Sequence, residues 1–138
     1  MTRSASARVA GAETSQATPR RVVMIVDDDS AVLRALNALV AEWGFSVVRF
    51  SNFEDARVYL SANTPDALVV DVRLGMFNGL QLVHLAKQVD PSMTVIAVSG
   101  FDDAVLRAEA TSVGAVYMIK PVNLEELRRQ LQSPDCAA

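Results

Sequence analysis

The hydrophobic residues of this chain gather in five short runs, separated by longer and partly polar stretches. The runs are Val22–Val26, Phe45–Phe50, Ala67–Val70, Thr94–Val98 and Ala115–Ile119. Each run has the length of a strand, and each is followed by a stretch in which apolar residues recur at helical spacing. Strict alternation of strand and helix, with strands apolar on both faces, predicts an α/β domain whose parallel sheet is covered by helices on each side.

Residues that commonly begin and end helices flank the helical stretches. Asp29, with Ser30 as the alternative, is expected to cap the first helix, and Asn123 the last. Ser51 and Glu54 have the spacing of a capping box and are expected to open the second helix. The third helix is expected to begin near residue 80, and the fourth to cover residues 102–112. The expected helix ends are marked by Gly44, Thr64-Pro65, Asp90-Pro91 and Gly114.

Each predicted helix has an apolar stripe that should face the sheet. A helical period of 3.6 residues brings positions three and four apart onto one face. The residues expected to face inward are Val32, Leu36, Leu39, Val40, Ala56, Tyr59, Leu60, Leu80, Val83, Ala86, Leu124, Leu127 and Leu131. These stripes are sufficient for one core, so we expect a single domain.

The composition narrows the class of protein. A length of 138 residues with 51% hydrophobic residues is typical of one globular domain. The net charge of −3 argues against direct binding of nucleic acid, which normally requires a basic surface. The apolar runs are far shorter than the roughly 20 residues that span a membrane. One cysteine, Cys136, excludes an intrachain disulfide and favours a cytoplasmic location.

The ends of the chain differ in composition from its middle. Residues 1–20 are rich in Ala, Ser and Thr, and contain Arg3, Arg8 and Arg20 against Glu13 as the one acidic residue. They lack the apolar core of a signal peptide, and we expect a disordered leader, with an organelle transit peptide as the alternative. We expect the folded domain over residues 21–132, and a short tail or the start of a linker over 133–138.

Residues whose side chains could bind an ion or take part in a reaction follow four of the predicted strands: Asp27-Asp28, Asp71, Ser99 and Lys120-Pro121. The carboxyl ends of parallel strands meet at one edge of a sheet, so these side chains should converge. Crowded carboxylates require a compensating cation, and Mg²⁺ prefers oxygen ligands. Asp28 and Asp71 could bind Mg²⁺ while an Asp71 oxygen attacks phosphorus. Ser99 and Lys120 could then hold the phosphoryl oxygens.

This ordered set resembles the receiver domain of two-component response regulators, from Arg21 to about Gln132. The resemblance rests on Asp27-Asp28, Asp71 within Val70-Asp71-Val72-Arg73-Leu74, Gly79 eight positions later, Ser99, Tyr117 and Lys120-Pro121. It implies a doubly wound, flavodoxin-like fold with five parallel strands in the order 2-1-3-4-5 and five helices. It also implies a signalling switch rather than an enzyme, apart from phosphoryl transfer and autodephosphorylation within the domain itself.

The resemblance assigns a role to each site residue. Asp71 would take a phosphoryl group from a phosphohistidine on a sensor histidine kinase or a phosphotransfer protein. Mg²⁺ would be bound directly by Asp28, Asp71 and the backbone carbonyl of Arg73, and through water by Asp27. Lys120 would pair first with Asp71 and then with the phosphoryl group, and its bond to Pro121 would be cis. On activation, Ser99 would shift toward the phosphate and Tyr117 would turn inward.

The same resemblance predicts where partners bind and where this chain departs from the family. A downstream protein or a second copy should dock on the fourth helix, fifth strand and fifth helix, without nucleic acid or membrane. Gly75 stands where the family often has proline, which predicts a more mobile loop. The segment 114–120 is one residue shorter than is usual, which affects the register of Tyr117. Arg73 and Phe101 occupy positions that flank the phosphoryl group and could control access of water.

Three alternatives remain open from the sequence. The chain could be the receiver fragment of a longer regulator with a DNA-binding or enzymatic output domain. It could be a Mg²⁺-dependent phosphohydrolase with an aspartyl-phosphate intermediate, although such enzymes usually have a second acidic residue where Arg73 stands. It could also be a scaffold of the same fold that binds partners without phosphorylation, which the complete acidic and lysine set disfavours.

Overall fold

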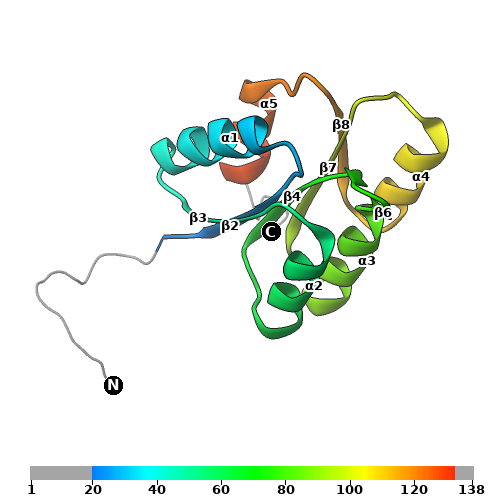
Figure 1. Cartoon of the computed structure of the whole chain (residues 1–138), viewed down its shortest axis with the longest axis horizontal. Helices are drawn as coiled ribbons and strands as arrows, with labels where there is room; N and C mark the ends of the chain where they lie inside the picture. The colour runs from blue at the N-terminus through cyan, green and yellow to red at the C-terminus, as the bar shows by residue number, and fades with distance from the viewer. Residues whose placement is uncertain (1–19, 133–138) are drawn as a thin grey trace, which may run out of the picture.

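The computed structural model describes residues 20–132, and it contains all five predicted strands and all five predicted helices (Figure 1). The strands of the main sheet are β2 (Val22–Val26), β3 (Ser46–Phe50), β4 (Ala67–Asp71), β7 (Thr94–Ser99) and β8 (Val116–Ile119). The helices are α1 (Ser30–Glu42), α2 (Phe53–Ala62), α3 (Leu80–Val89), α4 (Ala104–Ser112) and α5 (Leu124–Gln132). The predicted leader, apart from residue 20, and the predicted tail with Cys136 lie outside the described residues.

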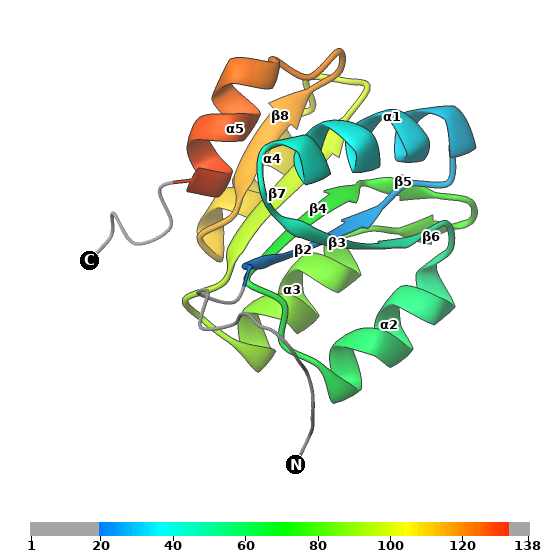
Figure 2. The same cartoon turned by 90° about the vertical axis from the view of Figure 1, so that its left-hand side faces the viewer.

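The five strands form one parallel sheet in the order β3-β2-β4-β7-β8. Counted along the chain, this is the predicted order 2-1-3-4-5, so the doubly wound fold is confirmed. Helices α1 and α5 cover one face of the sheet, and α2 and α3 cover the other (Figure 2). Helix α4 packs on the same face as α2 and α3. Alternate residues of β2 serve the two cores: Val23 and Ile25 pack toward α1 and α5, whereas Met24 and Val26 pack toward the other helices.

The helix caps agree with the sequence at two helices and differ at a third. The Asp29 carboxylate accepts hydrogen bonds from the backbone of Ala31 and Val32, so it caps α1. Asn123 likewise accepts from the Glu126 N–H at the start of α5. The capping box predicted for Ser51 and Glu54 is wrong by one residue. Asn52 is the cap, because its side chain both accepts from the Asp55 N–H at 2.8 Å and donates to the Asp55 carboxylate at 3.0 Å.

Three details of the predicted helices require correction. Leu124 is 47% exposed rather than buried, because it is the first residue of α5 and borders an open cavity beside α1. In α1, Leu33 is buried although the predicted stripe omitted it, and Leu36 is only half-buried. Helix α4 begins at Ala104 rather than at residue 102, because Asp103 accepts from the N–H groups of its first turn and caps it.

A short hairpin follows β4, where the sequence predicts only a loop. Its strands are β5 (Arg73–Leu74) and β6 (Phe77–Asn78), which pair antiparallel. Gly75 adopts the left-handed conformation, with φ +60°, that the turn between them requires. Phe77 stacks on Phe53 at the start of α2, with ring centroids 4.8 Å apart. Two-residue strands carry no detectable periodicity, so this hairpin could not be predicted from the pattern.

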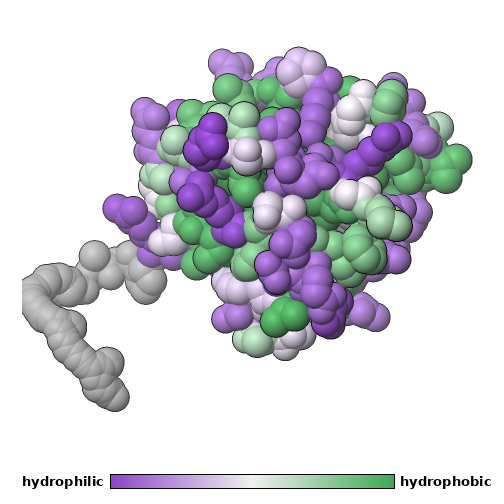
Figure 3. All heavy atoms as spheres, viewed as in Figure 1, coloured by the Kyte–Doolittle hydropathy of each residue, from purple (hydrophilic) through white to green (hydrophobic). Residues whose placement is uncertain are grey.

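The surface of the domain is mixed in character. Hydrophilic and hydrophobic side chains are interspersed over the face in Figure 3. Among the exposed large apolar residues are Met76 and Phe77 of the hairpin and Phe101 and Val105 near the start of α4. No helix within residues 20–132 is long and apolar enough to cross a membrane.

Candidate functional site

Four strands of the main sheet bring polar side chains to one edge. Asp71 is the last residue of β4 and Ser99 the last of β7, while Asp27 and Lys120 directly follow β2 and β8. The backbone ladder continues through both flanking positions. The Asp27 N–H donates to the Phe50 carbonyl at 3.1 Å, and the Lys120 N–H donates to the Ser99 carbonyl at 2.8 Å. The strands are parallel, so all four side chains lie at their carboxyl-terminal edge.

Three carboxylates converge at this edge. Asp27, Asp28 and Asp71 each offer an oxygen, and these oxygens lie within 4.8 Å of one another. Asp27 and Asp71 are only 4% and 7% exposed, whereas Asp28 faces solvent. Like charges at this separation repel one another. The cluster therefore fits a hard divalent cation with oxygen ligands, such as Mg²⁺.

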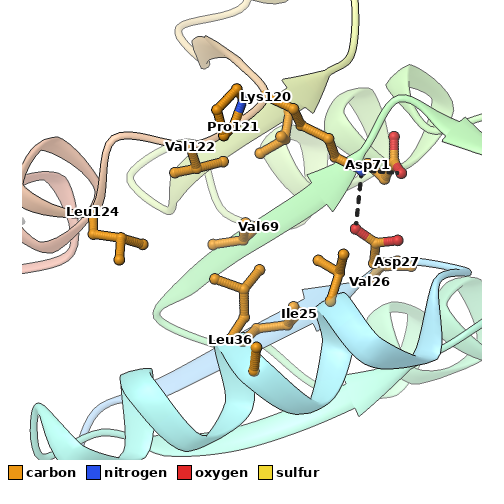
Figure 4. A pocket seen from close by; sticks show the side chains of 13 residues that line it. Ile25, Val26, Asp27, Leu36, Val69, Asp71, Lys120, Pro121, Val122 and Leu124 are labelled. Carbon is orange, nitrogen blue, oxygen red and sulfur yellow. Dashed lines mark hydrogen bonds and ion pairs between the residues drawn. The ribbon is translucent and has the colours of Figure 1, made fainter.

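Lys120 is the cation that reaches the buried pair. Its Nζ donates to Asp71 Oδ2 at 2.9 Å and lies 3.4 Å from Asp27 Oδ2 (Figure 4). The structure thus places Lys120 beside Asp71 as the sequence predicts, although the two residues are 49 positions apart. The peptide bond between Lys120 and Pro121 is cis, which confirms the prediction made from the resemblance.

The charges at the site perturb one another. Burial raises the pKa of Asp27, and the negative charge of Asp71 raises it further, against the opposing effects of the Asp29 N–H and Lys120. Burial alone would lower the pKa of Lys120, but its hydrogen bond to Asp71 and the charges of both aspartates outweigh that effect and raise it. The raised pKa of Lys120 has the sign expected where one ammonium group faces two carboxylates. An additional cation would reduce the excess of negative charge at the site.

Backbone N–H groups orient all three carboxylates. Asp27 Oδ1 accepts from the Asp29 N–H at 2.9 Å, and Asp71 Oδ1 accepts from the Arg73 N–H at 3.0 Å. Asp28 Oδ2 accepts from the Gly75 N–H at 3.0 Å, across 47 positions of sequence. In Asp27 and Asp71 the second oxygen remains directed at Lys120. The side chains are therefore held in position by the backbone.

Ser99 and Tyr117 are linked through one residue of the β7–α4 loop. Ser99 is buried, and its Oγ accepts from the Phe101 N–H at 3.1 Å. The Tyr117 hydroxyl donates to the Phe101 carbonyl at 3.0 Å. Tyr117 is 7% exposed and pairs in register with Ala97, so the short segment before β8 leaves it facing inward. The inward turn that we expected only on activation is the position observed.

Two hollows flank the acceptor position. One is an open cleft of about 460 Å³ between the hairpin and the start of α4, lined by Arg73, Ser99 and Phe101 among others. The Arg73 guanidinium lies over the Phe101 ring, 5.1 Å from its centroid, and forms part of this lining. The other is an apolar cavity of about 280 Å³ between α1 and α5, with Asp71 and Lys120 among its lining residues (Figure 4).

Some residues that shape the site were not assigned a physical role from the sequence. A Cβ at Gly79 would lie 2.1 Å from the backbone oxygen of Asp71, so this glycine lets the start of α3 approach the acceptor. The sequence marks Gly79 only by its spacing. The sequence marks Gly75 only as a departure from the family pattern, and does not point to the hydrogen bond from its N–H to Asp28. It gave no signal for the Arg107 side chain, whose guanidinium lies 4.9 Å from the Tyr117 ring centroid.

Comparisons with known proteins agree on one family. The family model described as "Response regulator receiver domain" matches residues 23–132. The response regulator protein TodT of Pseudomonas putida is 37% identical over 110 residues, which cover 77% of this chain and 47% of TodT. The chain therefore spans about half the length of that relative.

Solved structures share the fold. A CheY-like receiver domain from Methanospirillum hungatei superposes with a TM-score of 0.78 at 23% identity, covering 86% of this chain and 99% of that one. A response regulator from Burkholderia pseudomallei, solved with a phosphorylated aspartic acid, a calcium ion and citrate, gives a TM-score of 0.75 at 23% identity. That match covers 85% of this chain and 69% of the Burkholderia chain.

Proposed function

The chain belongs to the receiver domains of two-component response regulators, and we propose that its Asp71 accepts the phosphoryl group that controls binding of a partner. One observation carries the assignment of Asp71. Its carboxylate is the one that contacts Lys120 at 2.9 Å and also lies in the cluster with Asp27 and Asp28. The phosphorylated aspartic acid in the related Burkholderia structure supports the same chemistry. Labelling by a small phosphoryl donor, measured as a gain in intact mass, is the direct test.

The proposed transfer needs no general base. An Asp71 oxygen forms a bond to phosphorus while the bond from phosphorus to the donor's imidazole nitrogen breaks, and that nitrogen keeps the electron pair. The Lys120 ammonium group can pair with the Asp71 carboxylate before the transfer and with a phosphoryl oxygen after it. Ser99 already accepts the Phe101 N–H, so its hydroxyl proton can point to a second phosphoryl oxygen. Positioning and charge neutralisation by these groups supply the catalysis.

The residues at the site fit Mg²⁺. We propose that Asp28, Asp71 and the backbone carbonyl of Arg73 bind the ion directly, and that Asp27 does so through water. The fit rests on three carboxylate oxygens within 4.8 Å of one another. Lys120 forms ion pairs with Asp27 and Asp71 of this cluster. When bound, Mg²⁺ neutralises charge as the phosphoryl group approaches. The Arg73 N–H already donates to Asp71, which brings the Arg73 backbone beside the cluster.

Asp28→Asn should weaken Mg²⁺ binding. The substitution removes a negative charge from the exposed side of the cluster, where a cation would enter. In the parent protein, Mg²⁺ at 100 times its Kd should add about 2.7 kcal/mol to the free energy of unfolding, measured as a thermal shift. The variant should show most of that shift lost. Asp29→Asn is the matched control, because asparagine still caps α1, and an equal loss there would contradict the assignment.

Phe101→Ala should shorten the lifetime of the aspartyl phosphate by a few-fold. The Phe101 ring and the Arg73 guanidinium lie together in the wall of the cleft beside Ser99, and removal of the ring opens that wall to water. The measurement is the decay of phosphorylated protein after the donor is removed. Val105→Ala, which shortens an exposed residue of α4, should leave the decay unchanged. Equal lifetimes of the parent and Phe101→Ala would remove the proposed shielding role.

We also propose that the surface formed by α4, β8 and α5 is where a downstream protein or a second copy docks. Two exposed apolar residues support this position: Phe101 in the loop before α4 and Val105 in its first turn. Phe101 also contacts Ser99, so a change at the phosphoryl group can reach this surface. Hydrogen exchange should therefore change most over α4, β8 and α5 on phosphorylation. Changes confined to α1 and α2 would contradict the proposal.

Two alternatives from the sequence can be weighed. The hydrolase alternative has no support among the comparisons, and Arg73 is exposed at the position where an acidic residue would be needed. Phosphomonoesters should therefore not be turned over. The longer-regulator alternative is compatible with the 47% of TodT that the chain matches. We propose residues 21–132 as the receiver unit and the cytoplasm as its location, and recovery of a longer reading frame would identify an output domain.

A further inference from the structure

Tyr117 is held from two sides in the structure. Its hydroxyl donates to the Phe101 carbonyl at 3.0 Å, which fixes the outer end of the ring. Arg107 is a residue of α4, and its guanidinium carbon lies 4.9 Å from the centroid of the Tyr117 ring. A cation over the face of an aromatic ring attracts it through the ring quadrupole. The ring is thus bound at its edge by the β7–α4 loop and at its face by α4.

Arg107 is itself tied to the same loop. Its guanidinium forms an ion pair with Asp102 at 2.9 Å, and its side chain is 43% exposed. The ion pair holds the guanidinium near the loop, while the ring contact holds Tyr117 beneath it. An exposed ion pair contributes little stability by itself, so the contact with the ring is the one that should matter for Tyr117.

The contacts continue to the site. The Phe101 carbonyl accepts from Tyr117, and the Phe101 N–H donates to Ser99 Oγ at 3.1 Å. Phe101 is therefore fixed on both sides by hydrogen bonds. If Tyr117 left its position, the Phe101 carbonyl would lose its partner and the loop that orients the Ser99 hydroxyl would loosen.

We propose that Arg107 is a positioning residue that keeps Tyr117 inward and thereby orients Ser99 for the phosphoryl group. This proposal deepens the proposed function and rests on it for the role of Ser99. Its first part, the hold of Arg107 on Tyr117, concerns only contacts within the chain.

The experiment reads the position of Tyr117 directly. The chain has two tyrosines, Tyr59 and Tyr117, so 3-fluorotyrosine gives two ¹⁹F signals that a Tyr59→Phe variant assigns. The solvent isotope shift of the Tyr117 signal, between H₂O and D₂O, should be small in the parent. In Arg107→Ala the outward population should rise about fivefold, and the isotope shift should increase. Arg107→Lys, which keeps a cation, should restore much of the inward population.

The controls distinguish the contact between Arg107 and Tyr117 from the ion pair between Arg107 and Asp102 and from the proposed phosphorylation. Asp102→Asn removes the ion pair but leaves the guanidinium over the ring, so its Tyr117 signal should resemble the parent. The rate of labelling by acetyl phosphate should fall in Arg107→Ala and recover in Arg107→Lys. An unchanged Tyr117 signal in Arg107→Ala, or an equal change in Asp102→Asn, would overturn the proposal. If the parent took up no phosphate, the proposed function would fail, while the ¹⁹F result would still decide whether Arg107 holds Tyr117.

Discussion

Asp71→Ala should abolish the gain in mass that acetyl phosphate and Mg²⁺ give to the parent protein. Asp71 shares the acidic cluster with Asp27 and Asp28, and it forms the shorter contact with Lys120, at 2.9 Å against 3.4 Å for Asp27. With the donor supplied as a small molecule, no kinase is needed, since the domain itself supplies positioning and charge neutralisation. The measurement is intact mass after incubation with the donor.

The control for this variant is another aspartate near the same edge of the sheet. Asp102→Asn changes an exposed carboxylate of the β7–α4 loop that lies outside the cluster, and it should be labelled like the parent. Chelation of Mg²⁺ should prevent labelling of the parent. Gain of phosphate by Asp71→Ala at the parental rate would mean that another group is the acceptor and that the assignment is wrong.

The fold was predictable because local and global signals agree. Each strand of the main sheet is an apolar run of strand length, and each is followed by a helical stripe with a recognisable boundary residue such as Gly44 or Asn123. Parallel strands place their carboxyl ends together, so the convergence of Asp27, Asp71 and Lys120 followed from the order of elements alone. The structure brings these residues together as expected.

The failures occur where a side chain makes contacts that no periodicity records. Asn52 replaces Ser51 as the cap of α2 because its side-chain oxygen accepts from the Asp55 N–H. Asn52 and Asp55 have the three-residue spacing of a capping box but not its usual residue types, Ser or Thr followed by Glu or Gln. Leu124 fits the helical stripe of α5 but lies at its first turn, beside an open cavity. The position of Arg107 over Tyr117 depends on how α4 packs beside β8, which the sequence does not specify.

Gly79 provides the second large expected effect, and it concerns the backbone of the acceptor. Its φ of −60° and ψ of −16° are ordinary for any residue, so conformational freedom does not explain the glycine. The reason is space: a Cβ at this position would lie 2.1 Å from the backbone oxygen of Asp71 and 3.1 Å from the Cα of Val72. The Gly79 N–H also donates to the Val72 carbonyl at 2.6 Å, which holds the start of α3 against the end of β4.

Gly79→Ala should therefore lower the free energy of unfolding by about 3 kcal/mol. The added methyl group would overlap backbone atoms, which cannot avoid it by a change of rotamer as a side chain could. Relief of the overlap must move either Asp71 or the start of α3, so the labelling rate should fall as well. Gly100→Ala is the matched control: nothing lies within 4 Å of a Cβ there, although Gly100 also borders the site. Urea unfolding and labelling measured side by side test both effects. Parental stability in Gly79→Ala would show that α3 can withdraw from β4 at no cost, and that close approach to the acceptor is not the reason for this glycine.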